Sequence, residues 1–198
     1  MARSKAGGIG ALVSAVAFVA LAALTAWSIV TGTDAEGTRS VVWIVLTSLA
    51  TGGGAVAVFG ALRATGGFGA VKAKLALGFA VFAVMSAVLG WGLFGYGAAL
   101  AVAMVLLARH LRERGLGIAG HRSVWDWAMP VAWLVGPVSQ VVNMVVTGLV
   151  DNSAGIDWVS VIGFSLGTLL AAATMVVMGR WLRSDIPSSA PMVASATV

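Results

Sequence analysis

Long apolar runs alternate with short polar connections along the chain, and the lengths of these runs predict its helices. A helix needs about 20 apolar residues to cross a hydrocarbon core of about 30 Å at a rise of about 1.5 Å per residue. The runs predict transmembrane spans near 9–30, 41–62, 75–89, 96–112, 127–150 and 158–182. The first run is a full span rather than the shorter apolar core of a signal peptide, so we expect it to be a retained helix.

The third and fourth spans are divided by a glycine-rich sequence rather than by a polar loop. Residues 75–108 form a stretch of 34 residues without a formal charge, which is too long for one membrane crossing. The sequence GWGLFGYG at residues 90–97 contains four glycines, and we expect it to end one helix in a tight turn before the next begins. The fourth span then runs on as ARHLRER into the water.

Composition places the whole chain in the membrane class. Of its 198 residues, 60% are hydrophobic and 10% are charged, and the mean hydropathy is +1.00. A soluble domain of this size could not bury so much apolar side chain. The predicted fold is therefore an all-α integral membrane protein in which residues 1–184 form one six-transmembrane-helix bundle. Residues 185–198, rich in Ser, Ala and Pro, are predicted to be a flexible C-terminal tail.

Basic residues lie between the apolar runs and predict the orientation of the chain. If the N-terminus lies in the cytoplasm, eleven of the twelve Lys and Arg residues face inward and only Arg39 faces outward. Acidic residues such as Asp34 and Asp151 then fall in outer loops. The prediction is an N-in, C-in, multi-pass protein of the inner membrane, from a bacterium judging by its Ala, Gly and Val content. Its inner arginines are expected to meet membrane lipids, and basic residues dispersed in this way exclude nucleic acid as a partner.

The fifth span carries the most unusual polar pattern. At about 100° per residue, one stripe along this helix is formed by Trp133, Gly136, Gln140, Asn143 and Thr147. Pro137 predicts a kink beside the stripe. Because an unpaired amide in hydrocarbon costs several kcal/mol, we expect the stripe to face the bundle or a cavity rather than lipid.

The loop at residues 151–157 is short enough to make the fifth and sixth spans neighbours. Counting from the outer interface places Asn143 level with Ser165, and Gln140 level with Thr168. These side chains are predicted to face each other, either in direct hydrogen bonds or around a small polar cavity. The predicted ligand-binding residues are Gln140, Asn143, Trp133, Pro137, Thr147, Ser165 and Thr168.

Two functions remain open from the sequence. The first is binding or translocation of an uncharged or amphiphilic ligand through an intramembrane pocket beside the fifth helix. The second is a non-catalytic accessory or assembly subunit that docks on a partner membrane protein, or on a second copy, through the small residues Gly163, Gly167 and Ala171. No charged residue lies in the middle of a span, which argues against an ion-coupled carrier.

A serine-hydrolase motif is the first candidate for catalysis. Residues 163–167 match G-x-S-x-G, but hydrolases need a strand, a sharp turn and a helix to expose the serine, whereas this serine lies inside an apolar helix. The histidines, His110 and His121, belong to the opposite side of the membrane, about 15 Å from Ser165. A general base must lie within hydrogen-bonding reach, so we expect no enzymatic activity.

A metal site is the second candidate. The residues that could hold one are His110, Glu113, His121 and Asp126. Their spacing does not match a structural or hydrolytic zinc motif, and a solvated extension of the fourth helix explains His110 and Glu113 equally well. The chain has no cysteine. We expect no bound metal and no cofactor.

Overall fold

The computed structural model describes residues 4–31, 38–89, 93–116, 131–135, 137–139, 141–142, 145 and 153–184, without the side chains of residues 28–31, 38–40, 93–95 and 153–161. Within this part of the chain the secondary structure is entirely helical. Its elements are α1 (Lys5–Thr31), α2 (Thr38–Thr65), the short 3₁₀ helix η1 (Gly67–Gly69), α3 (Val71–Val88), α4 (Leu93–Glu113) and α6 (Ser153–Arg183). The fifth segment is helical at 131–135 and 137–139.

Most helix ends lie within a few residues of the predicted spans, but two connections differ. Gly95 and Gly97, which we expected in a turn, lie inside α4, because glycine is tolerated in helices whose backbone groups bond internally. α6 begins at Ser153, so Asp157 lies within the helix rather than in the preceding loop. A helix that extends past the hydrocarbon layer can keep such a carboxylate in water.

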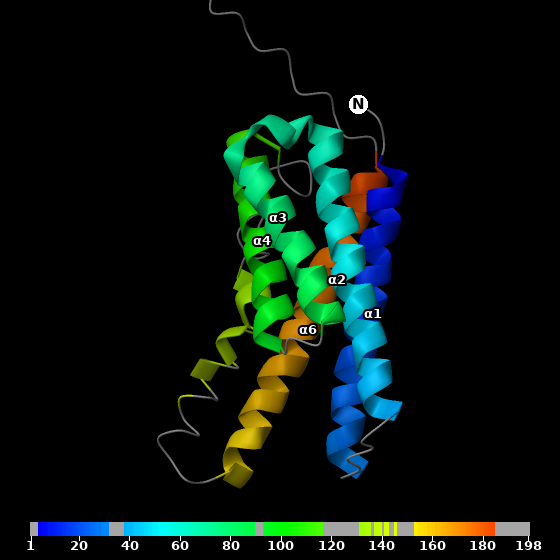
Figure 1. Ribbon diagram of the computed structural model, residues 1–198, viewed down its shortest axis with the longest axis vertical. Coiled ribbons are helices and arrows are strands. Elements are labelled where there is room, and N and C mark those ends of the chain that lie inside the picture. The colour runs from blue at the N-terminus through cyan, green and yellow to red at the C-terminus, as the bar shows by residue number, and fades with distance from the viewer. Residues whose placement is uncertain are drawn as a thin grey trace, which may run out of the picture.

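The helices lie roughly along one long axis, and from α1 to α4 each helix runs opposite to the one before it (Figure 1). α1 packs against both α2 and α6, while α3 packs against α2 and α4. The first residues of α1, the η1 turn and the last residues of α4 and α6 all lie at one end of the bundle (Figure 1). That end therefore carries Lys5, Arg63, Lys72, Lys74, Arg109, Arg112, Arg180 and Arg183, and we call it the basic end.

Glycines bring α1 and α2 unusually close together. A Cβ atom on Gly53 would lie 2.5 Å from the carbonyl oxygen of Gly10, and one on Gly60 would lie 2.6 Å from the Cα of Gly7. The same interface is bridged by the Ser14 hydroxyl, which donates a 2.6 Å hydrogen bond to the carbonyl oxygen of Ala50. Such close backbone contacts stabilise helix pairs in lipid, where dispersion replaces the hydrophobic effect as the driving force.

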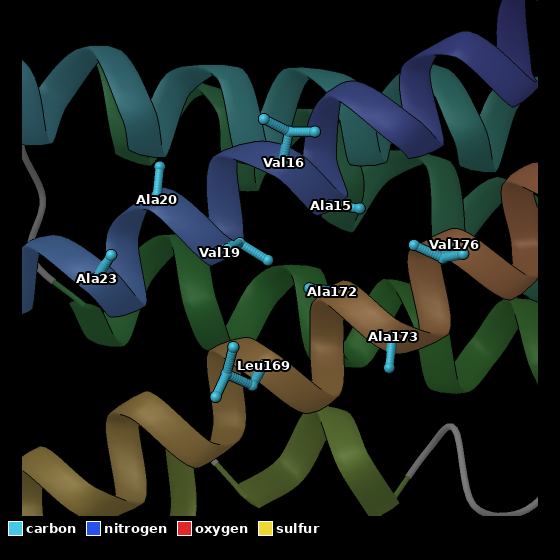
Figure 2. A pocket seen from close by; sticks show the side chains of 9 residues that line it. All are labelled: Ala15, Val16, Val19, Ala20, Ala23, Leu169, Ala172, Ala173 and Val176. Carbon is cyan, nitrogen blue, oxygen red and sulfur yellow. The ribbon is translucent and has the colours of Figure 1, made fainter.

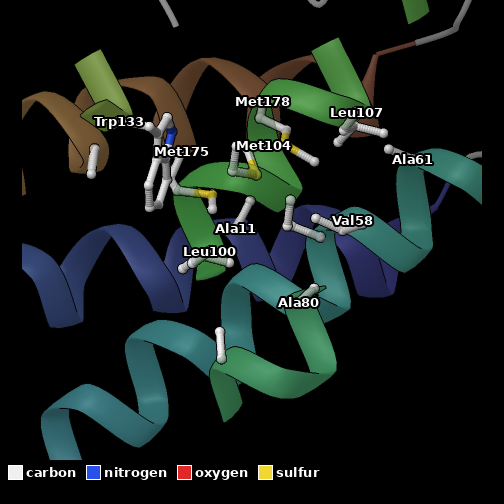
Figure 3. Close-up of a cluster of buried hydrophobic side chains, with 14 of the residues drawn as sticks. Ala11, Val58, Ala61, Ala80, Leu100, Met104, Leu107, Trp133, Met175 and Met178 are labelled. Atoms are coloured by element: carbon white, nitrogen blue, oxygen red, sulfur yellow. The ribbon is translucent and has the colours of Figure 1, made fainter. Parts of the chain in front are cut away.

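The interior is filled by alanines at the helix crossings and by longer side chains between them. Figure 3 shows Leu100 and Met104 of α4 beside Met175 and Met178 of α6, with Val58 of α2 nearby. All five are fully or almost fully buried. The flexible methionine side chains fill the irregular spaces that small residues leave.

The outside of the bundle is apolar over most of its length. Large aliphatic side chains stand exposed on several helices, including Val71 at 72% and Ile162 at 61% exposure. The segments Lys5–Trp27, Val41–Thr65, Val71–Val88 and Ile162–Arg183 are long and apolar enough to cross a membrane. An apolar exterior of this extent is typical of a protein solvated by lipid, so the fold is that of a helical bundle compatible with a multi-pass membrane protein.

Candidate functional site

Several of the residues that we predicted to bind a ligand lie outside the described residues. These are Gln140, Asn143 and Thr147, together with Gly136 from the same stripe. The prediction that the two amides face Ser165 and Thr168 therefore stays a prediction. The structure does place Trp133, Pro137, Ser165 and Thr168, and it shows how the fifth segment sits against α6.

Trp133 lies deep between the helices, as its position within the predicted span suggested. Its side chain is 5% exposed, and its indole Nε1–H donates a 2.8 Å hydrogen bond to the Thr174 hydroxyl on α6. Thr174 in turn donates to the carbonyl oxygen of Ala171. The edge of the Trp133 ring meets Phe18 of α1, with ring centroids 5.4 Å apart. Trp133 therefore joins the fifth segment to both α1 and α6.

A second contact between the fifth segment and α6 lies further from the basic end. A Cβ atom on Gly163 would overlap the Ser139 side chain, so the two chains touch closely there. Trp133 contacts Thr174, whereas Ser139, later in the fifth segment, contacts Gly163, which comes earlier in α6. The two segments are therefore antiparallel neighbours. Gly163 is thus covered by the chain itself, and Gly167 and Ala171 in the same row are buried.

Thr168 is buried, and its hydroxyl bonds within its own helix. The Thr168 Oγ1 lies 3.0 Å from the carbonyl oxygen of Phe164 and 2.9 Å from that of Ser165. One hydroxyl proton serves these two acceptors, so the Thr168 oxygen can still accept a bond from a neighbouring amide. Ser165 is half-buried one turn nearer the start of α6.

The described residues form an open groove between α1 and α6 that the sequence analysis did not predict. The two helices touch near the basic end, where a Cβ atom on Gly179 would lie 3.3 Å from the carbonyl oxygen of Gly8. They separate toward the opposite end (Figure 1). The groove has a volume of about 540 Å³. Figure 2 shows the residues that line it: Ala15, Val16, Val19, Ala20, Ala23, Leu169, Ala172, Ala173 and Val176.

Chemically, this groove offers only hydrocarbon. Every lining side chain among the described residues is that of Ala, Val or Leu, so these residues offer a ligand apolar contact and no side-chain hydrogen bonds. Alanines alternate with larger residues along both helices, and that alternation is common elsewhere in this chain. Only the separation of the two helices distinguishes these alanines, which is why the sequence did not reveal them.

A polar cluster lies at the basic end, where α4 meets the connection between α2 and α3. Arg114 Nη1 donates a 2.5 Å hydrogen bond to the carbonyl oxygen of Thr65, the last residue of α2. The Lys72 ammonium on α3 bonds the Glu113 carboxylate, and this bond holds the pKa of Glu113 below its usual value. The imidazole of His110, which belongs to the same end of α4, is buried and only 2% exposed.

The cluster does not assemble a metal site from the described residues. Of the four residues considered for a metal, His121 and Asp126 lie outside them, and nowhere in the described chain do three His, Asp or Glu side chains gather. His110 and Glu113 share the last two turns of α4, where Glu113 is engaged by Lys72.

No model of a known protein family matches this chain, and neither a curated protein nor a solved structure matches it. The residues and geometry described above are therefore the basis for the function that follows.

Proposed function

We propose that this chain is a small multi-pass membrane protein that binds an uncharged or amphiphilic ligand from within the bilayer. The observation that supports this best is the apolar groove of about 540 Å³ between α1 and α6, a volume within the range of about 300–1,000 Å³ that is usual for small-molecule sites. The ligand portion in the groove is a hydrocarbon chain, because the lining supplies no polar side chain.

The polar portion of the ligand is expected at the end of the groove away from the basic end. Ser165 lies one helical turn beyond Leu169 in that direction, on the same stripe of α6. Gln140 and Asn143 are predicted at the same depth from the sequence. In this proposal the fifth helix closes one flank of the α1–α6 pair and contributes its amides to the polar part of the site.

We further propose that the chain crosses the inner membrane six times, with both termini in the cytoplasm. The basic residues gathered at one end of the bundle (Figure 1) support this orientation, because cytoplasmic loops carry the excess of Lys and Arg. The groove opens toward the outer half of the membrane.

Lipid analysis of the purified protein tests the groove directly. In protein isolated from native membranes, Ala173→Phe should fill the groove and lower the amount of a copurified amphiphile several-fold, as measured by mass spectrometry. Ala173 is exposed, so folding should be retained. Val81→Phe is the matched control, because Val81 is 51% exposed on α3, which packs against α2 and α4. Equal ligand content in all three proteins would refute the proposal.

The fifth helix is tested separately with Gln140→Leu and Asn143→Leu. If the amides orient the polar portion of the ligand, the double variant should bind less ligand while Ala173 and the groove remain intact. Full ligand binding by a folded double variant would show that the amides do not contribute to the site. The proposal for the groove would be unaffected.

The alternative function is a non-catalytic accessory or assembly subunit. The small residues along the groove support it, since Ala20, Ala23 and Ala173 would let a partner helix approach closely. Copurification discriminates between the two functions. A complex of fixed stoichiometry supports the accessory role, whereas a lone protein with a bound small molecule supports ligand binding.

We propose no catalytic role for Ser165. It lies in the outer half of α6, while His110 lies at the basic end, so the described residues bring no general base to this serine.

A further inference from the structure

His110 is buried against the backbone of the connection between α2 and α3. A Cβ atom on Gly67, the first residue of η1, would lie 2.5 Å from the His110 Nε2. A larger side chain at residue 67 would overlap the imidazole edge, so either η1 or the ring would have to shift. The η1 turn itself begins after Gly66, whose φ of 65° is in the left-handed region. The position of η1 thus depends on the His110 ring.

Among the described residues, no group forms a hydrogen bond with the buried His110 Nε2. A neutral imidazole tolerates this arrangement, because the unprotonated Nε2 is only an acceptor left unpaired. An imidazolium would bury an N–H donor without an acceptor and a charge without a counterion, and both are costly. The geometry therefore favours the neutral ring.

The charged groups around His110 partly oppose one another, because Arg114 and Lys72 disfavour the protonated ring whereas Glu113 favours it. Its own helix contributes Arg114 and Glu113, and α3 contributes Lys72, while α2 and η1 face it with the uncharged Thr65 and Gly67. Glu113 is already bonded to Lys72, which leaves Arg114 as an excess positive charge. Burial, and then Arg114, therefore disfavour the charged form of His110.

Three contacts join the end of α4 to α2, η1 and the start of α3. Only one of them involves a residue type that changes charge near neutral pH. One contact is the hydrogen bond from Arg114 to the Thr65 carbonyl oxygen. A second contact is the Lys72–Glu113 pair, which is lost below the usual carboxyl value of 4.5, since the hydrogen bond from Lys72 lowers the pKa of Glu113. The third contact is that of the His110 ring with Gly67 of η1, and histidine is the residue type that changes charge between about pH 5 and 8.

We propose that His110 is a proton-sensitive lock that holds the connection between α2 and α3 against α4 when neutral and releases it when protonated. Acidification at the basic end of the bundle then opens η1, while the two other contacts limit the movement. This gives the protein a pH response on the side that we assign to the cytoplasm, and it does not depend on the identity of the ligand.

Hydrogen exchange of the full-length protein in lipid nanodiscs tests the lock. The amides to follow are those of Gly66 and Ala70, which bond the carbonyl oxygens of Arg63 and Gly67. After correction for the intrinsic rate, their opening should increase up to about tenfold between pH 7.5 and 5.5, if the released histidine has its ordinary pKa of about 6.5. His110→Gln should abolish this pH dependence, whereas His121→Gln should retain it.

A direct titration keeps the proposal testable if His110→Gln does not fold. In the His121→Gln protein, the single remaining imidazole should titrate by NMR below the ordinary pKa of histidine. A His110 that titrates at or above about 6.5, or η1 amides that open equally at both pH values, would overturn the lock.

Discussion

At the scale of single residues, most buried hydroxyls are satisfied by their own helix. Thr51 and Thr65 each bond the carbonyl oxygen four residues earlier, as serine and threonine commonly do in apolar helices. Side-chain bonds that cross between transmembrane segments are therefore informative where they occur. The bond from Trp133 to Thr174 is one of them, and it is one of the contacts between the fifth segment and α6.

The Trp133–Thr174 bond predicts a measurable coupling. Trp133→Phe keeps an aromatic ring beside Phe18 but removes the donor, and it should lower the free energy of unfolding by about 0.5–1.5 kcal/mol. Thr174→Val should cost a similar amount, and the double variant should lose little more than either single one. Unfolding in mixed micelles measures all three, and strictly additive losses would contradict the bond.

At the scale of helices, the distances between pairs are set by glycine. Gly53 and Gly60 let the backbone of α2 touch that of α1, and Gly179 does the same less tightly for α6. Where the residues become Ala, Val and Leu, α1 and α6 separate and the groove opens (Figures 1 and 2). The groove therefore begins where the interface between α1 and α6 no longer contains glycine.

Substitution of two glycines of α2 and α3 should have opposite effects. Gly53→Ala places a methyl group 2.5 Å from the Gly10 carbonyl oxygen and 2.8 Å from the Ser14 nitrogen. These are backbone atoms that cannot turn aside, so α1 and α2 must separate at a cost of about 1–3 kcal/mol. Gly78→Ala meets nothing within 4 Å and should be neutral or stabilising by up to about 1 kcal/mol. Equal effects in unfolding measurements would refute this packing.

The pair between Lys72 and Glu113 predicts how the contact of α3 with α4 depends on pH. The hydrogen bond from Lys72 lowers the pKa of Glu113 from its usual value of 4.5. A lowered carboxyl pKa contributes stability above that usual value, and the contribution is lost as pH falls through the pKa of the folded protein. NMR titration of the Glu113 carboxyl should give a pKa below 4.5 that rises in Lys72→Met. An unchanged pKa in this variant would show that the pair does not form in solution.

At the scale of the whole molecule, the gathering of basic residues at one end predicts the topology. Single cysteines near Ala35 and Asn152 should react with an impermeant thiol reagent added outside intact cells. Cysteines near Gly117 and Ser188 should react only after the membrane is opened. The parent protein has no cysteine, so no background needs removal. The opposite labelling would reverse the side to which the His110 lock and the open end of the groove are assigned.

The sequence by itself predicted an all-helical chain with several helices apolar enough to span a membrane, and it predicted that the basic residues gather on one side. A backbone in hydrocarbon must bond internally, so a sufficiently long apolar run forms a helix. Run length alone predicted α1 and α2 to within a few residues at each end. The neighbouring placement of the fifth segment and α6 was predicted from a short loop at residues 151–157, although α6 begins within that loop, at Ser153. Whether Gln140 and Asn143 face α6 stays a prediction, since both lie outside the described residues.

Only the tertiary structure decided where the helices touch and where they separate. Gly10 and Gly53 are more than forty residues apart, and nothing local to either glycine indicates that their backbones meet. The groove exists because α1 and α6 are close at Gly8 and Gly179 and apart at Ala15 and Ala172. His110 reads in the sequence as one polar residue of a solvated helix end, yet η1 covers it and leaves its Nε2 unpaired. Such features depend on the volumes of side chains from distant helices at one depth, which no single apolar run contains.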